Sequence, residues 1–435
     1  YQDAAVGAEK KYDYVIVDEC SQAGVMLGLI AMSCGKRVVL IGDVEQLAPV
    51  FNDNRADELR RNFSDINPLY MEESEKSFLE VCCTVFGQLE DTSVMLTGHY
   101  RCHPSIIGFN NKYVYNGMLE PLARTGTARM LPADKLAIRV VWYEGDYFEI
   151  HKKPDGKRPE HTNFRQQRIL FEEEMPRIIE KLRRDPDYSV GIIAPYRSIL
   201  EYVREELDRQ TYRADLGEVT LEDDQAGDSA EDTAPHFAVL TIHRSQGKGC
   251  NCIIYLSSED SSYETRWPWS QQKRMMNVAV SRAKNELCVI TSSLWLPVEF
   301  QDAHAAHTIA VKKKNAPEEE RDNLFLYKLL DYVYRDCAEL DCGEEYGFHK
   351  SAITSIFDEV PYYREKYNTA RNTDGFLSAP ALCMKKALEK RYPQYSVFTE
   401  VPLTFIAPES APNEQRLDFV VCSGSRVLAA IEVDG

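Results

Sequence analysis

Two short apolar runs that end in acidic residues constrain the fold of this chain more than any other feature. The first run (Tyr-Val-Ile-Val) leads into Asp18 and Glu19, and the second (Val-Val-Leu-Ile) leads into Gly42, Asp43 and Gln46. A run this apolar, with no alternation, is typical of a strand buried on both faces of a parallel sheet. Because open α/β sheets place their ligands at the carboxyl ends of the strands, the acids would lie at a ligand-binding edge.

Acids at such strand ends have two possible roles. In a magnesium–nucleotide site, one carboxylate holds the hydrated metal and another orients a water molecule, and Asp18 and Glu19 have the chemistry for both tasks. The structural alternative is a helix cap, because acidic residues after strands often accept backbone N–H groups of the following helix. Both interpretations stay open at this point.

Strand-like and helical patterns alternate along most of the chain. This alternation predicts βαβ units, and therefore an α/β fold with a parallel sheet. Two charged segments interrupt this alternation, a loop at 151–160 and an acidic insertion at 217–235. The expected strands are 93–97, 136–143, 190–194, 237–242, 252–257 and 287–291. The expected helices are one opened by Pro104, then 164–183, 199–210, 275–283, 324–336 and 378–391, followed by strands at 397–405, 417–422 and 427–433.

The composition is that of an ordinary globular protein, with 44% hydrophobic and 28% charged residues among 435. A chain of this length accommodates two to four domains, each with its own core. It contains no run of about 18 apolar residues and no signal-peptide pattern, so we expect a cytoplasmic, intracellular protein with no membrane partner. We also expect it to be a fragment of a longer polypeptide, because it starts without methionine and stops within a motif.

Cysteine usage and net charge limit two further classes of function. The 12 cysteines include no Cys-x-x-Cys pair, which favours reduced, buried thiols over a zinc cluster. The net charge of −18 argues against a protein that binds polyanions over its whole surface. It leaves room for a local basic groove, because nucleic-acid affinity comes from a few well-placed Lys and Arg side chains.

Five short polar motifs follow the first acidic loop in a fixed order, at spacings that core packing alone does not explain. In the expected helix 275–283, Asn277, Ser281 and Lys284 follow at intervals of four and three, and would share one face. The five motifs are Gly42-Asp43-x-x-Gln46-Leu-x-Pro49, Tyr100-Arg101-x-His103-Pro104, Ala194-Pro195-Tyr196-Arg197, Thr241-Ile-His243-Arg244-Ser245-Gln246-Gly247 and Asn277-x-x-x-Ser281-Arg282-Ala-Lys284.

Together these motifs resemble superfamily 1 helicases, most closely the branch that includes the nonsense-mediated decay helicase. The resemblance covers about residues 12–292 and implies two RecA-like α/β domains with ATP bound in the cleft between them. On this basis residues 1–98 form the C-terminal part of the first RecA-like domain, residues 99–300 form the second, and residues 301–375 form a linker or helical connector. Residues 376–435 form a further domain.

The resemblance implies a role in nucleotide chemistry for nine residues. Phosphoryl transfer depends mostly on positioning and on neutralising charge, and guanidinium groups supply both. The implied roles are Asp18 for Mg²⁺, Glu19 for the hydrolytic water, Gln46, Arg101 and Arg282 for the γ-phosphate, Tyr100 for the adenine, and Asp43, Gln246 and Gly247 for other nucleotide contacts.

The resemblance also implies contacts with single-stranded nucleic acid, either DNA or RNA. Small polar groups after a strand can bind phosphates through hydroxyl and backbone N–H groups, although glycines in the same loop suit a plain turn equally well. The residues concerned are Pro195, Tyr196, Arg197, Thr241, His243, Arg244 and Ser245.

Three features depart from the family pattern. A phosphate-binding loop of the form Gly-x-x-x-x-Gly-Lys-Ser/Thr would precede Asp18 by well over a hundred residues, but only seventeen residues stand before it. The stretch printed here would therefore lack the lysine for the β- and γ-phosphates, and we expect it not to hydrolyse ATP without the N-terminal part of the same polypeptide. Gly249 stands near a position where the family often has an acid, and His99 and Cys102 alter the usual Gln-Tyr-Arg-Met-His-Pro sequence.

A second group of acids lies near the C-terminus. Asp418 belongs to one expected strand, and Glu432 and Asp434 stand two residues apart at the end of the next, which puts these two on one face. Acids on adjacent strands can hold one metal ion, Mg²⁺ or Mn²⁺. Residues 376–435 resemble PD-(D/E)XK nucleases of the very-short-patch-repair type, with Asp434 in place of the usual lysine. A solvated hairpin with ordinary surface acids is the structural alternative.

The sequence thus predicts an ATP-dependent helicase or translocase fused to a metal-dependent nuclease-like domain. Two alternatives stay open. One is a non-catalytic nucleic-acid-binding scaffold, and the other is a nuclease for which the motor only feeds substrate.

Overall fold

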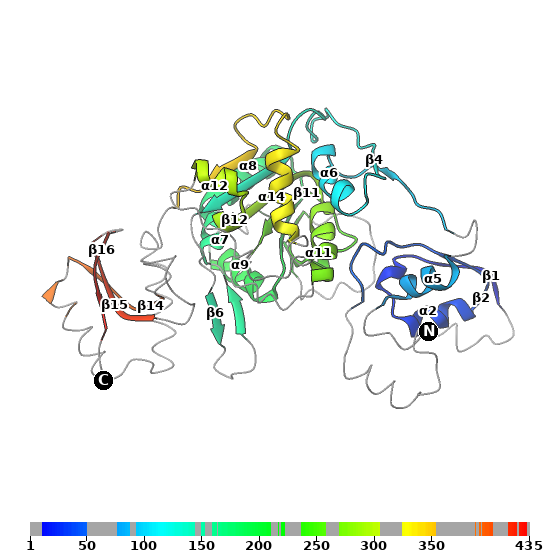
Figure 1. Cartoon of the computed structure of the whole chain (residues 1–435), viewed down its shortest axis with the longest axis horizontal. Helices are drawn as coiled ribbons and strands as arrows, with labels where there is room; N and C mark the ends of the chain where they lie inside the picture. Colours follow the sequence, from blue (N-terminus) through cyan, green and yellow to red (C-terminus); the bar gives the residue numbers. More distant parts are fainter. Residues whose placement is uncertain are drawn as a thin grey trace.

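The computed structural model describes most of the chain in separate ranges (Figure 1). These are residues 11–49, 76–87, 93–143, 149–152, 159–162, 164–209, 216, 219–221, 236–257, 269–304, 324–353, 388, 391–392, 394–402, 416–423 and 426–432. The expected helix at 378–391 lies almost wholly outside them, as does most of the acidic insertion at 217–235. Within these ranges no helix has the length and apolar character needed to cross a membrane.

The N-terminal unit contains the two strands that the opening apolar runs predict. Strands β1 (Tyr12–Val17) and β2 (Gly35–Leu40) pair in parallel, and Tyr14 lies opposite Arg37. The 3-10 turn η1 (Cys20–Gln22) and helix α2 (Val25–Ser33) connect them. The parallel pairing and the crossover helix confirm the βαβ prediction for this stretch.

Helix α5 (Phe78–Phe86) covers the same unit. It begins at a capping box, in which Ser77 accepts from the backbone of Glu80 while the Glu80 carboxylate accepts from the backbone of Ser77. The Phe78 ring packs so closely on α2 that a Cβ on Gly28 would lie 2.1 Å from it. The core of the unit consists of Cys20, Phe78, Leu79 and Cys82.

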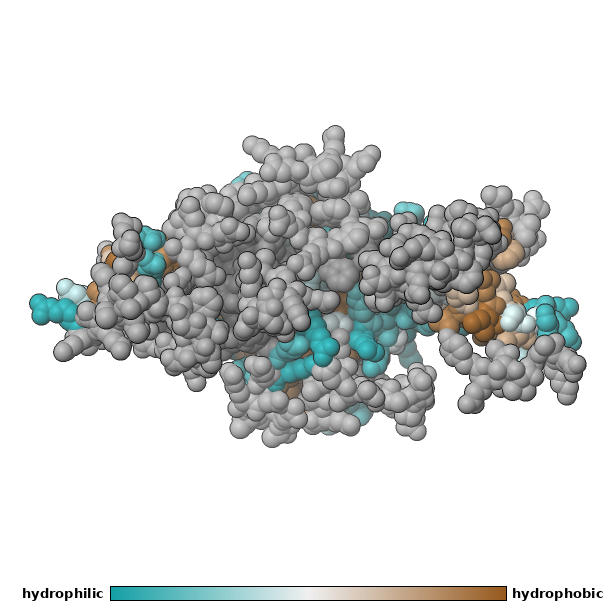
Figure 2. Space-filling model, turned by 90° about the horizontal axis from the view of Figure 1, so that it is seen from below, coloured by the Kyte–Doolittle hydropathy of each residue, from teal (hydrophilic) through white to brown (hydrophobic). Residues whose placement is uncertain are grey.

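The prediction that β1 and β2 are buried on both faces is wrong for the described residues. Tyr12, Tyr14 and Ile16 are 56%, 57% and 65% exposed, whereas Val15 and Val17 on the opposite face are partly buried. Only one face of this two-stranded sheet packs against described helices, so alternate side chains are left in water. Figure 2 shows apolar surface gathered on this unit, to which the exposed Met26, Leu27, Leu29 and Ile30 of α2 contribute.

The largest element is a seven-stranded sheet of order β13-β5-β12-β11-β8-β10-β9, in which every pairing is parallel. This confirms the predicted α/β fold class. The sheet also contains two strands that were not predicted: β13, and β9, which lies within the predicted acidic insertion at 217–235 and pairs with β10. The strands are β5 (Ile138–Tyr143), β8 (Val190–Ala194), β9 (Val219–Leu221), β10 (Phe237–Thr241), β11 (Cys250–Leu256), β12 (Ala283–Ser292) and β13 (Gly347–Lys350).

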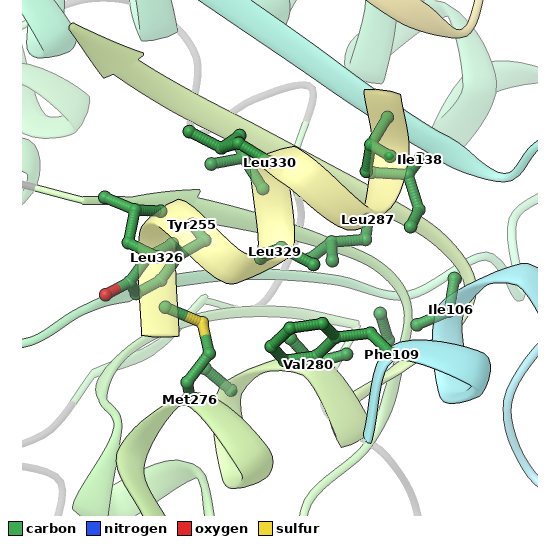
Figure 3. Close-up of a cluster of buried hydrophobic side chains, with 14 of the residues drawn as sticks. Ile106, Phe109, Ile138, Tyr255, Met276, Val280, Leu287, Leu326, Leu329 and Leu330 are labelled. Atoms are coloured by element: carbon green, nitrogen blue, oxygen red, sulfur yellow. The ribbon is translucent and has the colours of Figure 1, made fainter. Parts of the chain in front are cut away.

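Helices cover both faces of this sheet and form two cores. On the first face, Ile106 and Phe109 pack with Met276, Leu326 and other apolar side chains (Figure 3). Alternation along each strand divides the cores, because Val140 belongs to the first and its neighbour Val141 to the second. The helices of the first face are α6 (Pro104–Tyr113), α11 (Trp269–Ser281), α12 (Val298–His304) and α14 (Phe325–Arg335); those of the second are α7 (Phe164–Ile169), α8 (Met175–Arg184) and α9 (Arg197–Arg209).

A buried ionic network fixes α8 to the sheet. A π-helical turn (Leu170–Glu174) joins α7 to α8 and places the Glu174 carboxylate, 0% exposed, between Arg139 and Arg177 at 2.9 and 3.0 Å. Arg177 also contacts Glu286 on β12 at 2.5 Å. Burial alone raises the pKa of Glu286, but the adjacent cations outweigh it, so the pKa is lowered and the carboxylate stays charged.

Two local predictions need correction. Residues 93–97 form no strand; Val94 and Leu96 are 87% and 82% exposed, since the run has no strand partner among the described residues, and a short strand β3 (Gly98–His99) follows it. Strand β3 pairs with β4 (Glu120–Pro121). The ends of the predicted loop at 151–160 belong to an antiparallel hairpin, made by β6 (Glu149–Lys152) and β7 (Pro159–Thr162).

Part of the predicted connector at 301–375 is integral to the large sheet. Helix α14 packs into its first core, and β13 pairs with β5 through Phe348 and Val140. The apolar stripe of α14 accounts for its place in the core, and the position of β13 at the edge of the sheet accounts for its pairing with β5. The boundaries assigned at 98, 300 and 375 themselves stay predictions.

The C-terminal region contains the three strands that its apolar runs predict. Strands β14 (Ser396–Pro402), β15 (Arg416–Ser423) and β16 (Arg426–Ile431) form an antiparallel sheet in that order. Apolar side chains lie on both faces, with Phe419 on one and Val420 on the other. In Figure 1 this small sheet and the N-terminal unit lie at opposite ends of the large sheet.

Candidate functional site

The loop after β1 presents two carboxylates to solvent. Glu19 adopts the left-handed conformation (φ 50°, ψ 35°), which costs free energy in a residue other than glycine and tends to occur at functional sites. Its backbone N–H donates to Asp18 Oδ1 at 2.8 Å, and its Oε2 accepts from Gln22 Nε2 at 3.1 Å. The side chain of Glu19 does not cap the following turn η1. The helix-cap alternative therefore fails for Glu19.

The loop after β2 is organised by the Asp43 carboxylate. Its Oδ1 accepts from the backbone of Glu45 at 2.9 Å, and its Oδ2 accepts from Gln46 Nε2 at 3.2 Å. Gln46 Oε1 also accepts a long hydrogen bond of 3.4 Å from Gln246 Nε2, on the loop after β10. Two predicted motif residues separated by 200 positions in the sequence thus meet.

The segment that leads into α6 separates exposed from buried groups. Tyr100 is 72% exposed and Arg101 is exposed, whereas Cys102 and His103 are fully buried. The Nε2 atom of His99 accepts from the backbone of Cys102 at 3.1 Å. Burial lowers the pKa of His99 to about 4, assisted by the positive charges of Arg101 and Arg282. The imidazole of His99 is therefore neutral near pH 7. Tyr100, the residue predicted to contact the adenine, is largely exposed to solvent.

Arg282 lies directly after α11 and is 3% exposed. Its Nε donates to the backbone oxygen of Val278 at 3.2 Å, and its Nη2 donates to Ser281 Oγ at 3.1 Å. Burial first, and then the charge of Arg101, lower the pKa of Arg282 to about 10, while the carboxylate of Glu19 acts in the opposite direction. Two guanidinium groups and the Glu19 carboxylate are therefore within electrostatic reach of one another.

The prediction that Asn277, Ser281 and Lys284 share one helix face is wrong for Lys284. Helix α11 ends at Ser281, and Lys284 belongs to strand β12. Since the helix gives way to the strand two residues before Lys284, a helical interval no longer applies to it. The backbone oxygen of Lys284 instead accepts from the backbone of His103 at 2.7 Å, which ties β12 to the start of α6.

The loop after β10 has the geometry of a compact turn. The Ser245 hydroxyl is 1% exposed and donates to the backbone oxygen of Ile242 at 2.7 Å, and Gly247 has a φ of 81° that favours glycine. Thr241 is buried, His243 is partly buried and Arg244 is exposed. The plain-turn interpretation thus accounts for Ser245, while Arg244 presents a cation at the surface and Lys248 is partly exposed.

The motif after β8 leaves the sheet at the same edge. Ala194, the last residue of β8, pairs with Thr241, so the loop of Pro195 and the loop of Thr241 begin side by side. Pro195 is buried, and Tyr196 packs against the second core. Arg197 is exposed and forms an ion pair with Glu201 at 3.4 Å. Apart from the arginine, this motif contributes mainly to packing.

Gly249 lies beside the cationic groups. A Cβ at this position would be 3.2 Å from Lys284 Cε and 3.5 Å from Arg101 Cδ. The close approach leaves little room for the acidic side chain that the family often has near here, unless the lysine or the arginine moves.

Sequence reasoning missed the role of Tyr115 and Asn110. The Tyr115 hydroxyl donates to Asp43 Oδ2 at 2.5 Å and accepts from Asn277 Nδ2 at 2.9 Å, and Asn110 Nδ2 donates to Asn277 Oδ1 at 2.8 Å. One signal for Asn110 was present, because it follows Ile106 by four residues and so lies on the apolar stripe of α6, where a polar group needs a specific partner. No pattern distinguished Tyr115.

The C-terminal acids are only partly described. The last pair in the β15–β16 register is Phe419 opposite Ile431; Asp418 precedes Phe419 on β15, and Glu432 follows directly after the end of β16. Asp434 lies outside the described residues. Within the ranges that the structure describes, no group of three or more His, Cys, Asp or Glu side chains has the arrangement of a metal site.

Comparison with known families gives two matches of the same description. A family described as “AAA domain” matches residues 75–294, and a second family with that description matches residues 3–53. The two matches together include the acidic loops, helices α6 and α11 and the sheet strands between them. The resemblance to helicases is supported by curated relatives that are named as helicases.

Two curated relatives are helicases. The chain is 27% identical over 285 residues to the “DNA replication ATP-dependent helicase/nuclease DNA2” of Gallus gallus, covering 65% of this chain and 23% of the relative. It is 24% identical over 285 residues to “Helicase SEN1” of Saccharomyces cerevisiae, covering 64% of this chain and 11% of the relative. The chain therefore spans less than a quarter of the length of either.

Among solved structures, an arterivirus helicase, nonstructural protein 10, in complex with DNA is 14% identical, with coverage of 66% of this chain and 41% of that one. The TM-score is 0.27. A likeness this weak carries no argument about fold or function.

Proposed function

Because this chain belongs to the AAA domain family, which matches residues 75–294, we propose that it is the core of an ATP-dependent nucleic-acid helicase or translocase. The observation that carries the proposal is the meeting of motif residues from distant parts of the sequence. Gln246 Nε2 donates to Gln46 Oε1 at 3.4 Å, although the two residues lie 200 positions apart. The activity is proposed for the full-length protein, since the chain spans 23% of its relative DNA2.

In this proposal the loop after β1 prepares the attacking water. Glu19 accepts a proton from that water or orients it, and the hydrogen bond from Gln22 Nε2 at 3.1 Å holds the carboxylate. Gln46 contacts the γ-phosphate, and its amide is held by Asp43 at 3.2 Å. Tyr100, 72% exposed, offers a free aromatic face to the adenine.

Asp18 fits a magnesium-bound nucleotide. Its carboxylate is exposed, and Mg²⁺ in nucleotide sites takes one or two carboxylates together with phosphate oxygens and water. When bound, Mg²⁺ neutralises charge that develops on the β- and γ-phosphates. Asp18 would hold the hydrated ion, while its Oδ1 accepts from the Glu19 backbone.

Arg101 and Arg282 supply cations from the other side of the nucleotide. They belong to the segment before α6 and to the end of α11, whereas Asp18 and Glu19 belong to the N-terminal unit. Hydrolysis then depends on how closely the two parts approach, which couples ATP turnover to a change in domain position. Arg244, which is exposed, is a cation that would contact the phosphates of a single strand of DNA or RNA, and Arg197, paired with Glu201 and also exposed, lies on the neighbouring loop.

The test is a Glu19→Gln substitution in the full-length protein. We expect nucleic-acid-stimulated ATP hydrolysis to fall by at least about 100-fold, since the base is lost, while ATP binding stays within a few-fold of the wild type. Glu339→Gln, at an exposed glutamate far from these loops in the sequence, is the matched control and should keep full activity. Unchanged turnover in Glu19→Gln would refute the assignment. ATP binding without turnover in the wild type would instead favour a non-catalytic scaffold.

A metal-dependent nuclease activity is a second candidate, supported by the pairing of Phe419 with Ile431, the residues next to Asp418 and Glu432. Carboxylates that adjoin a strand pairing in this way can share one divalent cation, with Asp434 as the further acid of the proposed site. Asp418→Asn should abolish Mg²⁺- or Mn²⁺-dependent cleavage of single-stranded DNA or RNA and leave ATP hydrolysis intact. Cleavage that persists in this variant would exclude the site.

A further inference from the structure

Tyr115 joins two parts of the molecule that the sequence keeps apart. It follows helix α6 by two residues, and its hydroxyl is in contact with Asp43 in the loop after β2 and with Asn277 on α11. The Asp43 contact spans 72 positions and the Asn277 contact spans 162. A single hydroxyl therefore connects the N-terminal unit with two helices on the first face of the large sheet.

On the N-terminal side, the hydroxyl holds the loop that carries Gln46. Asp43 Oδ2, which accepts from Tyr115 at 2.5 Å, also accepts from Gln46 Nε2 at 3.2 Å, while Oδ1 accepts from Glu45 N at 2.9 Å. Both carboxylate oxygens are thus in use within the loop. If the Tyr115 bond is removed, the carboxylate that orients Gln46 loses its fixed point outside the loop.

On the other side, the hydroxyl is held by a buried amide pair. Asn277, 1% exposed, donates through Nδ2 both to Tyr115 and to the backbone oxygen of Glu45 at 2.9 Å. Asn110, 0% exposed, donates to the backbone oxygen and to Oδ1 of Asn277 at 3.0 and 2.8 Å. These linked hydrogen bonds, formed in a low dielectric, hold the Asn277 amide and the Tyr115 hydroxyl in place, whereas Asn110 Oδ1 accepts no hydrogen bond from the described residues.

The charge state of Tyr115 keeps the network intact. Burial, followed by the neighbouring Asp43 carboxylate, raises the pKa of Tyr115 well above its usual value of 10. The phenol therefore stays protonated and donates to Asp43. The hydroxyl has one proton and gives it to the carboxylate, so the bond from Asn277 has to be an accepted one.

Helix α11 links the network to Arg282. Val278, the residue after Asn277, accepts at its backbone oxygen from both the backbone N–H and the Nε of Arg282, at 3.2 Å in each case. A displacement of α11 at Asn277 therefore displaces the guanidinium of Arg282. Gln46 and Arg282, the two proposed γ-phosphate contacts, are held in register by this chain of hydrogen bonds.

We propose that Tyr115 is a positioning residue that couples the loop of Gln46 to helix α11 and through it to Arg282. Its catalytic consequence rests on the proposed ATP hydrolysis, whereas its structural consequence does not. Tyr115 itself touches neither metal nor phosphate. It acts by keeping groups of the two sides in the geometry needed for hydrolysis.

The structural consequence is tested on this chain by hydrogen–deuterium exchange. Tyr115→Phe removes one hydroxyl and keeps the ring, so exchange should accelerate several-fold, up to about tenfold, in residues 41–49 and 275–282. Tyr332→Phe is the matched control. It removes another buried hydroxyl on the same face, which donates to the backbone oxygen of Ser105 at 3.0 Å, and it should leave the exchange of residues 41–49 unchanged.

The catalytic consequence is tested in the full-length protein by steady-state kinetics. Tyr115→Phe should lower kcat at least about tenfold and leave KM for ATP within about threefold, because small misplacements of catalytic groups cost rate more than ground-state binding. Tyr332→Phe should keep the wild-type kcat. If kcat fell only because a buried hydroxyl was removed from this face of the sheet, Tyr332→Phe would lower kcat as much as Tyr115→Phe does.

The outcomes separate the hypotheses. Unchanged exchange of residues 41–49 in Tyr115→Phe overturns the inference at its base. Accelerated exchange with an unchanged kcat overturns the coupling to Arg282. If the wild-type protein does not hydrolyse ATP at all, the proposed function fails, and the exchange experiment still decides whether Tyr115 positions the loop.

Discussion

His99 illustrates how one residue responds to a cluster of positive charge. It accepts the backbone N–H of Cys102 and lies near Arg101 and Arg282. Burial, followed by the positive charges of Arg101 and Arg282, lowers the pKa of His99 to about 4, since a proton on its ring would be a third cation in this cluster. Replacement of the usual glutamine by histidine at this position therefore preserves a neutral acceptor near pH 7.

The consequence is a pH-dependent stability that His99→Gln should reduce. The pKa of His99 is about 4 in the folded state and about 6.5 in the unfolded chain, so between these values the unfolded chain binds the extra proton and stability falls as the pH falls. The slope is at most about 1.4 kcal/mol per pH unit, and less because the ring is partly exposed. Glutamine keeps an acceptor but does not titrate.

Urea unfolding at pH 7, 6 and 5 measures this difference. This range lies above the usual pKa of carboxylates, so Asp and Glu groups contribute little to the comparison. We expect the wild type to lose more stability than His99→Gln between pH 6.5 and 5, and the two to have similar pH dependence above pH 7. Parallel curves for the two proteins would contradict the assignment of this slope to His99.

At the residue scale the sequence identified motif members better than their surroundings. Motif spacing pointed to Gln46, Gln246 and Arg282, and the structure brings each into contact or electrostatic range of another motif. It did not point to Tyr115, because a contact 72 positions away leaves no trace in local periodicity. It misjudged Lys284, because a helical interval was carried past the end of the helix.

Elements depend on close packing as well as on periodicity, as the contact of α2 with α5 illustrates. Helix α2 is apolar along its whole length, so its pattern does not specify which side is covered. Gly28 specifies it, because only a residue without Cβ lets the Phe78 ring lie against the helix backbone. The aromatic ring then fills the space that a side chain would occupy.

Gly28→Ala should therefore destabilise the N-terminal unit, although alanine is the better helix former by about 1 kcal/mol. The new methyl group would overlap the Phe78 ring, and overpacking of this kind costs about 1–3 kcal/mol or more. Exchange protection of residues 25–33 and 78–86 is the measurement. In a double-mutant cycle, Phe78→Leu should partly rescue Gly28→Ala, whereas strictly additive effects of the two changes would argue against the overlap.

Element prediction succeeded where an apolar run was flanked by clear signals and had a partner. Residues 190–194 were predicted as a strand and form β8 with both faces buried. Residues 93–97 also contain a run of apolar side chains, yet they form no strand. Pairing partners, and not composition alone, decide whether such a run becomes a strand. Strand β13 was missed because Gly-Phe-His-Lys is short and half polar, as suits the edge of a sheet.

At the scale of the whole molecule, two ion pairs accompany the Tyr115 network between the N-terminal unit and α11. Lys273 contacts Glu45 at 2.6 Å, and Arg274 contacts Glu80. Each side chain is between about a fifth and a third exposed, so single pairs of this kind contribute about 1 kcal/mol or less. Their combined reversal is a sharper probe, because it replaces two attractions by two repulsions.

The double variant Lys273→Glu/Arg274→Glu should loosen the N-terminal unit from the large sheet at low ionic strength. Hydrogen–deuterium exchange of residues 41–49 should accelerate, and added salt should diminish the difference from the wild type by screening the new repulsion. Arg183→Glu/Arg184→Glu on α8 changes the net charge by the same amount and serves as the control. Equal exchange in both double variants would mean that these ion pairs do not hold the unit.

The edge strand β13 has a consequence for the order of events during synthesis. Its partner β5 leaves the ribosome about two hundred residues earlier, since Arg139 pairs with Gly347. For that interval the outer edge of β5 has no native neighbour, and its apolar residues can pair with a strand of another nascent chain. We expect the large sheet to reach its final form only after translation of α14 and β13.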